Sequence, residues 1–166
     1  MPGISQDEFD RIFSDWYYQL RNYVYYKSGD MQAAEDIVQD TFLKIWERKD
    51  SIRTDTVKSL MYKIANNLFL NRLDHQKVLL KFSSDYVINE HTAAPDFELE
   101  MKEFDQKLQR SISELDEKNR VVFLMNRIDN LTYKEIAQNL GLSQKAIEKR
   151  MGKAIAFLKE KLDVKI

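Results

Sequence analysis

Apolar residues recur every three or four positions along most of this chain, a spacing typical of helices that bury one face. In the first half, this pattern predicts three or four helices in succession. Ser5 and Glu8 form the sequence signature of a capping box, so the first helix begins there, and it ends at Gly29. Asp30 caps the second helix, in which aliphatic residues again follow one stripe. The N-terminal part of the chain is therefore predicted to be a bundle of helices.

The predicted third helix, residues 56–79, lies between two segments that lack helical spacing. Residues 50–55 form a polar loop around one isoleucine, Ile52, which we expect to be exposed. Residues 81–97 contain Ser-Ser-Asp, asparagine, threonine and proline, and we interpret them as a flexible acidic linker, with an ordinary surface loop as the alternative. A loop of this length in a small protein is usually functional or a linker.

Residues 132–155 predict two short helices around a tight turn. Thr132 and Glu135 form a second capping box, and Gly141 follows the last apolar position, where a left-handed residue ends a helix at little cost. Ser143 then caps another helix, which is apolar on one side and basic on the other. This pattern is typical of a helix-turn-helix that places its second helix in the major groove of DNA. An ordinary helical hairpin with a solvated lysine face is the alternative.

Composition favours an all-α fold, because helix-forming residues dominate and the 166 residues include only 2 Pro and 4 Gly. Hydrophobic residues make up 43% of the chain, so a packed core is feasible. The absence of cysteine excludes a disulfide framework and a cysteine-ligated zinc site. The sequence has neither a basic-then-apolar leader nor an apolar run of membrane-spanning length, so a cytoplasmic location is expected.

The formal net charge of −1 hides an uneven distribution of charge along the chain. Residues 81–104 hold 2 basic and 6 acidic residues, a net charge of −4, whereas residues 105–166 hold 13 basic and 9 acidic residues, a net charge of +4. The cationic end coincides with the predicted helix-turn-helix, as expected for a nucleic-acid binder. We therefore predict two small helical domains, residues 1–80 and 98–166, joined by the linker 81–97.

Three segments resemble, in this order, a sigma factor of bacterial RNA polymerase: AEDIVQDTFLKIWERKD, YKIANNLFLNRL and, after the acidic linker, LDEKNRVVFLMNRIDNLTYKEIAQNLGLSQKAIEKR. The resemblance covers about residues 7–162 and is to the compact extracytoplasmic-function group, which keeps only regions 2 and 4. It implies a non-catalytic subunit, without a cofactor, that binds core RNA polymerase and directs it to promoter DNA. Members of this group are commonly held inactive by an anti-sigma factor, so such a partner is expected here as well.

The resemblance implies that the second helix docks on a coiled coil of the polymerase clamp. Asp36, Gln39 and Asp40 stand at positions i, i+3 and i+4 and therefore share one face of that helix. Trp46 follows on nearly the same side and is the expected aromatic anchor. A solvated acidic face with a core tryptophan is the alternative. The expected polymerase-binding residues are Asp36, Gln39, Asp40, Phe42 and Trp46.

The loop after the second helix and the start of the third helix match the family's reader of the −10 promoter element, where the DNA is opened. Asparagine reads base edges through its donor and its acceptor, and basic side chains hold phosphates. The family commonly has tryptophan where this chain has Leu60, and often an aromatic residue where it has Ile52, so base stacking is expected to be weaker here. The alternative is that the asparagines are ordinary polar residues on the surface of the helix. The expected −10 contacts are Ile52, Arg53, Lys63, Asn66, Asn67 and Asn71.

The second helix of the helix-turn-helix matches the family's reader of the upstream, or −35, element. Lysine contacts guanine acceptors or phosphates, and glutamate accepts a hydrogen bond from the cytosine amino group. Arg150 has two alternatives to a base contact: it reaches the DNA backbone, or it braces its own domain. The expected −35 contacts are Gln144, Lys145, Glu148, Lys149, Arg150 and Lys153.

Three other functions account for less of the sequence. A stand-alone helix-turn-helix regulator that binds DNA as a dimer leaves the segments resembling region 2 without a role. A protein adaptor would keep its function after Lys145, Lys149 and Lys153 were neutralised. A helical carboxylate metal enzyme needs Glu-x-x-His pairs, and neither His75 nor His91 has a glutamate three residues before it. A hydrolase nucleophile elbow and a phosphate-binding glycine loop are also missing, so we expect no enzyme activity and no metal.

Overall fold

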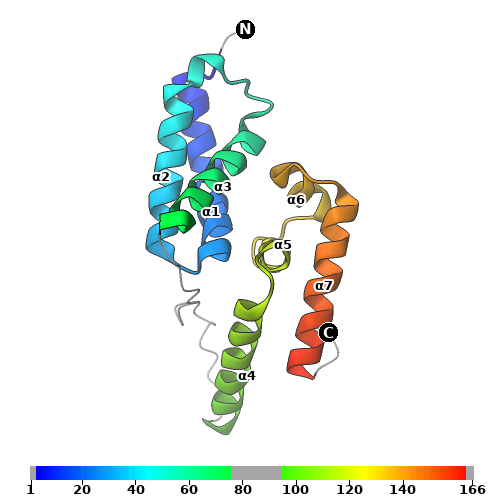
Figure 1. Ribbon diagram of the computed structural model, residues 1–166. Helices are drawn as coiled ribbons and strands as arrows, with labels where there is room; N and C mark the ends of the chain where they lie inside the picture. The colour runs from blue at the N-terminus through cyan, green and yellow to red at the C-terminus, as the bar shows by residue number, and fades with distance from the viewer. Residues whose placement is uncertain (1–2, 76–94, 164–166) are drawn as a thin grey trace.

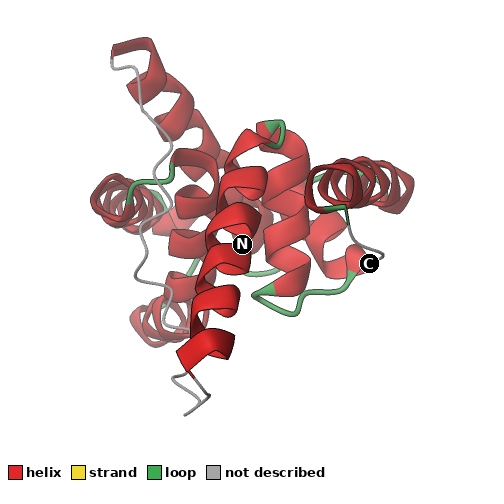
Figure 2. Ribbon diagram, turned by 90° about the horizontal axis from the view of Figure 1, so that it is seen from below, coloured by secondary structure: helices red, strands yellow, loops and turns green. Residues whose placement is uncertain are grey.

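The computed structural model describes residues 3–75 and 95–163, and within these two ranges it contains helices and no strand (Figure 1, Figure 2). The all-α prediction is therefore confirmed. None of the described helices is both long and apolar enough to cross a membrane. The elements are α1 (Gln6–Ser28), α2 (Met31–Glu47), the 3-10 turn η1 (Lys49–Ser51), α3 (Val57–His75), α4 (Pro95–Glu114), α5 (Glu117–Arg127), α6 (Tyr133–Leu140) and α7 (Gln144–Leu162).

The ends of the first two helices follow the predicted capping signals. The backbone N–H of Glu8 donates to Ser5 Oγ at 3.2 Å, and the backbone N–H of Ser5 donates to Glu8 Oε2 at 2.8 Å. Gly29 ends α1 in the left-handed conformation, with φ 67°. Asp30 accepts a hydrogen bond from the N–H of Ala33 and so begins α2. These bonds satisfy backbone groups that have no partner inside a helix, which fixes where each helix begins or ends.

Helices α1, α2 and α3 form the first module, in which α1 and α2 pack as a hairpin and α3 crosses them (Figure 1). Aromatic rings fill much of the contact between α1 and α2. The ring of Phe42 lies 4.9 Å from that of Phe13 and 6.2 Å from those of Phe9 and Tyr17. Phe42 is only 3% exposed. Its ring packs against α1, so the side chain does not lie on the outward face of the helix with the other residues expected to bind polymerase.

The loop between α2 and α3 also differs from the prediction. Ile52, expected to be exposed, is 7% exposed and belongs to the core of the first module. The turn η1 folds the loop back, and the backbone N–H of Ile4 donates to the carbonyl of Lys49 at 2.8 Å. The only large apolar side chain of a polar loop is thereby removed from water, which is favourable in proportion to its buried area.

Helices α4 to α7 form the second module, in which α5, α6 and α4 all pack against α7. α4 begins at Pro95 and so extends into the range 81–97 that was predicted as a linker. An ion pair between Lys161 and Glu114, at 3.3 Å, links α7 to α4. Asp116 stands at the N-cap position of α5, but its side chain makes no capping bond. The end of the predicted third helix and most of the linker fall on residues 76–94, which lie outside the described residues.

Candidate functional site

The predicted bend between α6 and α7 is present, and each of its signals makes the expected contact. Thr132 Oγ1 accepts from the backbone N–H of Glu135 at 3.1 Å, and Glu135 Oε2 accepts from the N–H of Thr132 at 2.8 Å. These bonds hold the pKa of the Glu135 carboxyl below its ordinary value. Gly141 ends α6 with φ 67°, and Ser143 Oγ caps α7 by accepting from the N–H of Ala146 at 3.1 Å. The two helices are thus positioned as a helix-turn-helix.

The corner of the bend is closed by backbone bonds and buried aliphatic side chains. The N–H groups of Gly141 and Leu142 both donate to the carbonyl of Ala137. Ile136 of α6 and Ile147 of α7 are fully buried and fix how the two helices pack. A rigid bend of this kind gives α7 a defined direction, which a helix needs in order to enter a DNA groove in one register.

Two glycines of this module provide a matched test of the turn. A Cβ placed at Gly141 or at Gly152 meets no neighbouring atom within 4 Å, so only backbone conformation distinguishes the two sites. Gly141→Ala is expected to destabilise the fold by about 1–2 kcal/mol, because its positive φ disfavours any side chain. Gly152→Ala lies inside α7 and is expected to stabilise the fold by about 0.5–1 kcal/mol. Urea unfolding of both variants checks the opposite signs, and equal effects would contradict this reading of the turn.

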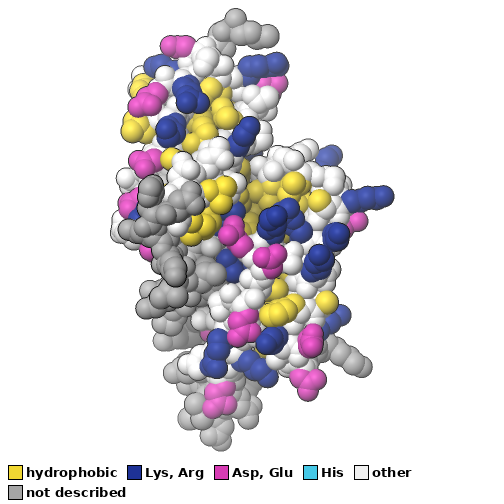
Figure 3. Space-filling view, viewed as in Figure 1, with side chains coloured by type: hydrophobic (Ala, Val, Ile, Leu, Met, Phe, Trp, Pro, Cys, Tyr) yellow, Lys and Arg dark blue, Asp and Glu magenta, His cyan; other side chains and the backbone are white. Residues whose placement is uncertain are grey.

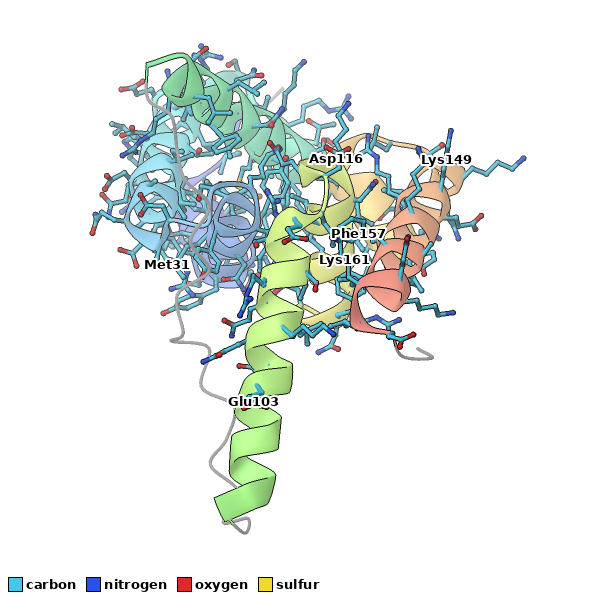
Figure 4. All side chains as sticks on the ribbon, turned by 60° about the horizontal axis from the view of Figure 1, so that its bottom comes forward. Met31, Glu103, Asp116, Lys149, Phe157 and Lys161 are labelled. Carbon is cyan, nitrogen blue, oxygen red and sulfur yellow. The ribbon has the colours of Figure 1, made fainter. Side chains whose placement is uncertain are left out.

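The face of α7 opposite its buried residues is polar and exposed. Figure 3 shows Lys and Arg side chains gathered over α7, and Figure 4 shows Lys149 on the outer side of this helix. None of its three outward lysines forms an ion pair with another described residue. Their charges therefore remain available to phosphates. The exposed residues predicted to contact the −35 element are Gln144, Lys145, Glu148, Lys149 and Lys153.

Arg150 differs from the other predicted −35 residues. It is half-buried, and it lines a cavity between the two modules rather than the outward face of α7. Whether Arg150 reaches the DNA backbone or braces its own domain stays a prediction.

The outward face of α2 is polar and partly acidic. Gln39 and Asp40 are exposed, and Asp36 accepts from Gln32 at 3.1 Å and lies 3.8 Å from Arg72 of α3. The predicted polar residues thus share one surface. Trp46 is half-buried beside them, with its ring 5.0 Å from Phe9 and the Lys49 ammonium 3.7 Å above its face.

A leucine on the same surface of α2 was not identified from the sequence. Leu43 is 55% exposed, one turn after Gln39 and one turn before Glu47. Because residues four apart share a face of a helix, it lies at the centre of the outward polar stripe. An apolar residue within a polar stripe was the signal that could have identified it. An exposed leucine ringed by polar groups is the usual composition of a protein-binding surface.

The residues predicted to read the −10 element fall into three environments. Asn67 and Asn71 of α3 are exposed, and Arg53 is exposed and paired with Asp55 at 2.9 Å. Lys63 and Asn66 line the cavity between the modules. Ile52 packs in the core, contrary to the expectation that it is exposed.

The two modules meet along α1 and α5, where a buried arginine joins them. Arg120 is 1% exposed, and its guanidinium donates to the carbonyls of Tyr26 at 2.7 Å, Lys27 at 3.1 Å and Leu115 at 3.0 Å. Burial lowers the pKa of Arg120, and the nearby carboxylates of Glu117 and Asp116 oppose this effect. Since the carbonyls at the end of α1 are the negative end of the helix dipole, a cation there is favourable.

A carboxylate and an ion pair add to this junction. Asp129 Oδ1 accepts from Asn22 Nδ2 at 3.0 Å and from Tyr26 Oη at 2.9 Å. Burial raises the pKa of the Asp129 carboxyl, and these two hydrogen bonds oppose the rise. Lys27 Nζ lies 2.7 Å from Glu117 Oε1. These contacts could not be predicted from sequence patterns, because their partners stand about a hundred positions apart.

Beside this junction, α3 faces the helix-turn-helix across a cavity of about 780 Å³. Its walls come from both modules. α3 contributes Lys63, Asn66 and Leu70, and the turn contributes Leu140 to Leu142. No group of His, Cys, Asp or Glu side chains in the described ranges is arranged to hold a metal ion.

Comparison with known proteins matches both modules to one family. The family description of sigma-70 region 2 matches residues 12–78, and that of sigma-70 region 4 matches residues 105–158. The chain is similar to RNA polymerase sigma factor YlaC of Bacillus subtilis, with 24% identity over 95% of this chain and 93% of the relative. It is also similar to ECF RNA polymerase sigma factor SigW of the same organism, with 26% identity over 91% of this chain and 85% of the relative.

A solved structure supports the same fold. It is the co-crystal structure of the sigma factor RpoE with the anti-sigma factor NepR from Bartonella quintana. The match covers 96% of this chain and 99% of that one, with a TM-score of 0.65 and 21% identity.

Proposed function

Because this chain belongs to the sigma-70 family of RNA polymerase sigma factors, in its extracytoplasmic-function group, we propose that it binds core RNA polymerase and directs it to promoters. The observation that carries the proposal is the order of the modules. A region 2 match precedes a region 4 match that contains a complete helix-turn-helix with an exposed basic face. We assign region 2 to residues 1–80, the linker to 81–97 and region 4 to 98–166.

In region 4, α7 is the proposed reader of the −35 element. Its five outward side chains combine lysines with a glutamine and a glutamate, so the helix carries both phosphate-binding and base-reading groups. Gln144 and Lys145 stand at the start of α7, and the first turn of a recognition helix is the part that approaches base edges most closely. Lys149 and Lys153 then extend the same face by two turns.

In region 2, the outward face of α3 is the proposed reader of the −10 element. Asn67 and Asn71 are exposed one turn apart, which suits successive unstacked bases. Arg53 supplies positive charge in the loop leading into α3, and Lys63 supplies it within α3. Since Ile52 and Phe42 are buried, neither belongs to a proposed contact surface.

The proposed polymerase contact is the outward face of α2, formed by Asp36, Gln39, Asp40, Leu43 and Trp46. The same exposed surface suits capture by an anti-sigma factor, which we propose as a second protein partner. A protein that works through these contacts needs no catalytic group and no cofactor. Binding to bacterial polymerase would place it in the cytoplasm.

Gel filtration with purified bacterial core polymerase tests this function. The full chain is expected to co-elute with core, and the complex is expected to protect promoter DNA in two separate patches, one for each module. A single symmetric footprint, made by the chain without core, would instead favour a stand-alone dimeric regulator.

A further inference from the structure

We propose that residues 3–5 form a brace that positions the loop between α2 and α3 for reading of the −10 element, with Gly3 and Ile4 as positioning residues. The brace is the short segment directly before α1, and the loop is residues 48–56. The inference rests on the function proposed for this loop and for α3. It gives a role to a segment that lies outside the proposed contact surfaces.

A backbone hydrogen bond and a buried side chain attach the brace to the loop. The N–H of Ile4 donates to the carbonyl of Lys49 at 2.8 Å. The Ile4 side chain is 3% exposed, the Ile52 side chain of the loop is 7% exposed, and both belong to the buried core. In Figure 1, the start of α1 lies beside the end of α2, so the segment before α1 reaches the turn η1 directly.

Gly3 allows the backbones of the brace and the loop to touch. A Cβ placed at Gly3 would overlap the carbonyl oxygen of Lys49 and lie 2.7 Å from the carbonyl carbon of Asp50, whereas real Cβ atoms essentially never come within 3.0 Å of a neighbour. The φ of Gly3 lies outside the left-handed region, so the close approach itself requires glycine here. Because the neighbours are backbone atoms, no side-chain rotation makes room. A larger residue would therefore push the brace and the loop apart.

The loop is also held on its other side, by α2. The backbone N–H of Ser51 donates to the carbonyl of Arg48 at 2.9 Å, which closes the turn η1. The Lys49 ammonium lies 3.7 Å above the ring of Trp46, a residue of the proposed polymerase contact. Lys49 is thus fixed by the brace through its carbonyl and by α2 through its side chain. The exposed Arg53 follows this fixed part of the loop and leads into α3.

A loop that is ordered before DNA arrives favours promoter opening. Ordering a flexible loop on binding costs conformational entropy, and a preorganised loop avoids that cost. Opening the −10 element also costs free energy, because bases are unpaired and unstacked, and the cost is least where the DNA is already single-stranded. Loss of the brace is therefore expected to reduce transcription mainly where the protein has to open the duplex. A segment that only covered the core would affect duplex and pre-opened templates equally.

The variant Gly3→Ala tests the brace on two templates. One is a duplex promoter that the unaltered chain uses with core polymerase. The other keeps the non-template strand of that promoter and carries a non-complementary template strand across the −10 element. Run-off transcription by the variant is expected to fall about tenfold on the duplex, because disorder at roughly one residue corresponds to a factor of this size. On the pre-opened template it is expected to stay within about twofold of the parent, since no duplex has to be opened.

Ile12→Ala is the matched control for a general loss of stability. Ile12 is a buried residue of α1, so its truncation destabilises the same module without altering the brace or the loop. The ratio of duplex to pre-opened transcription is expected to equal that of the parent in this control and to fall only in Gly3→Ala.

The ratio separates failure of the brace from failure of the proposed function. A parent-like ratio for Gly3→Ala, through full activity or through equal loss on both templates, would overturn the brace and leave the proposed function intact. A ratio lowered to the same extent by Ile12→Ala would also overturn it. Inactivity of the unaltered chain with core on both templates would contradict the proposed function itself, and the brace with it.

Discussion

Replacing Leu43 by aspartate is expected to weaken binding of the chain to core polymerase about 30-fold. The side chain is 55% exposed at the centre of the polar face of α2, the position where an apolar anchor contributes most to an interface. Burying a carboxylate there without a partner adds a desolvation cost, and a hot-spot loss of about 2 kcal/mol corresponds to this factor. A fluorescence titration of labelled chain with core measures the effect.

Leu70→Asp is the control for this prediction, because Leu70 is also an exposed leucine of region 2 but belongs to α3. Both variants are expected to keep the melting temperature of the parent chain, since neither side chain is in the core. The control is expected to bind core with the parent affinity. If Leu43→Asp bound core within twofold of the parent, the proposed docking face of α2 would be wrong.

Neutralising the basic face of α7 is expected to have the largest effect on DNA binding. In the triple variant Lys145→Gln, Lys149→Gln and Lys153→Gln, up to three phosphate contacts are lost. Since each contact contributes about 0.9 to the slope of log K against log salt, the slope is expected to flatten by about 2.7. Affinity of the polymerase complex for promoter DNA at 0.1 M salt is expected to fall by roughly two to three orders of magnitude. Filter binding over a range of salt concentrations measures both quantities.

The control for the lysine variant lies further along the same helix. Lys159→Gln with Lys161→Gln removes two charges from the end of α7 that lies beside α4, as the position of Lys161 in Figure 4 illustrates. This double variant is expected to keep the parent salt slope. An unchanged slope in the triple variant would mean that α7 does not lie against the DNA backbone.

The helix boundaries could be predicted because their causes are local in sequence. Ser5 with Glu8, and Thr132 with Glu135, satisfy backbone groups within one turn, so each capping box is visible as a short motif. Gly141 is visible for the same reason, since one residue alone provides the left-handed conformation. These signals, together with helical periodicity, were enough to predict the helix-turn-helix and its outward lysines.

The remaining features depend on contacts between distant residues. Ile52 stands in a polar loop and Phe42 stands beside the acidic stripe of the second helix, but η1 folds the loop inward and α1 covers the flank of α2. Arg120 and Asp129 look like ordinary surface charges, and their partners in α1 stand about a hundred positions away. Hydrogen bonds of this kind leave no spacing in the sequence, so neither residue was identified. Leu43 was not identified because the acidic residues around it led us to interpret this face of the helix as polar.

Run-off transcription from a library of random promoters, with purified core polymerase and the full chain, tests the central claim most directly. The account predicts that transcripts start at a selected subset of templates that share an upstream element and a downstream element at fixed spacing. Omission of the chain should abolish this selection, and the lysine variant of α7 should weaken preference for the upstream element. Identical start sites with and without the chain would contradict the account.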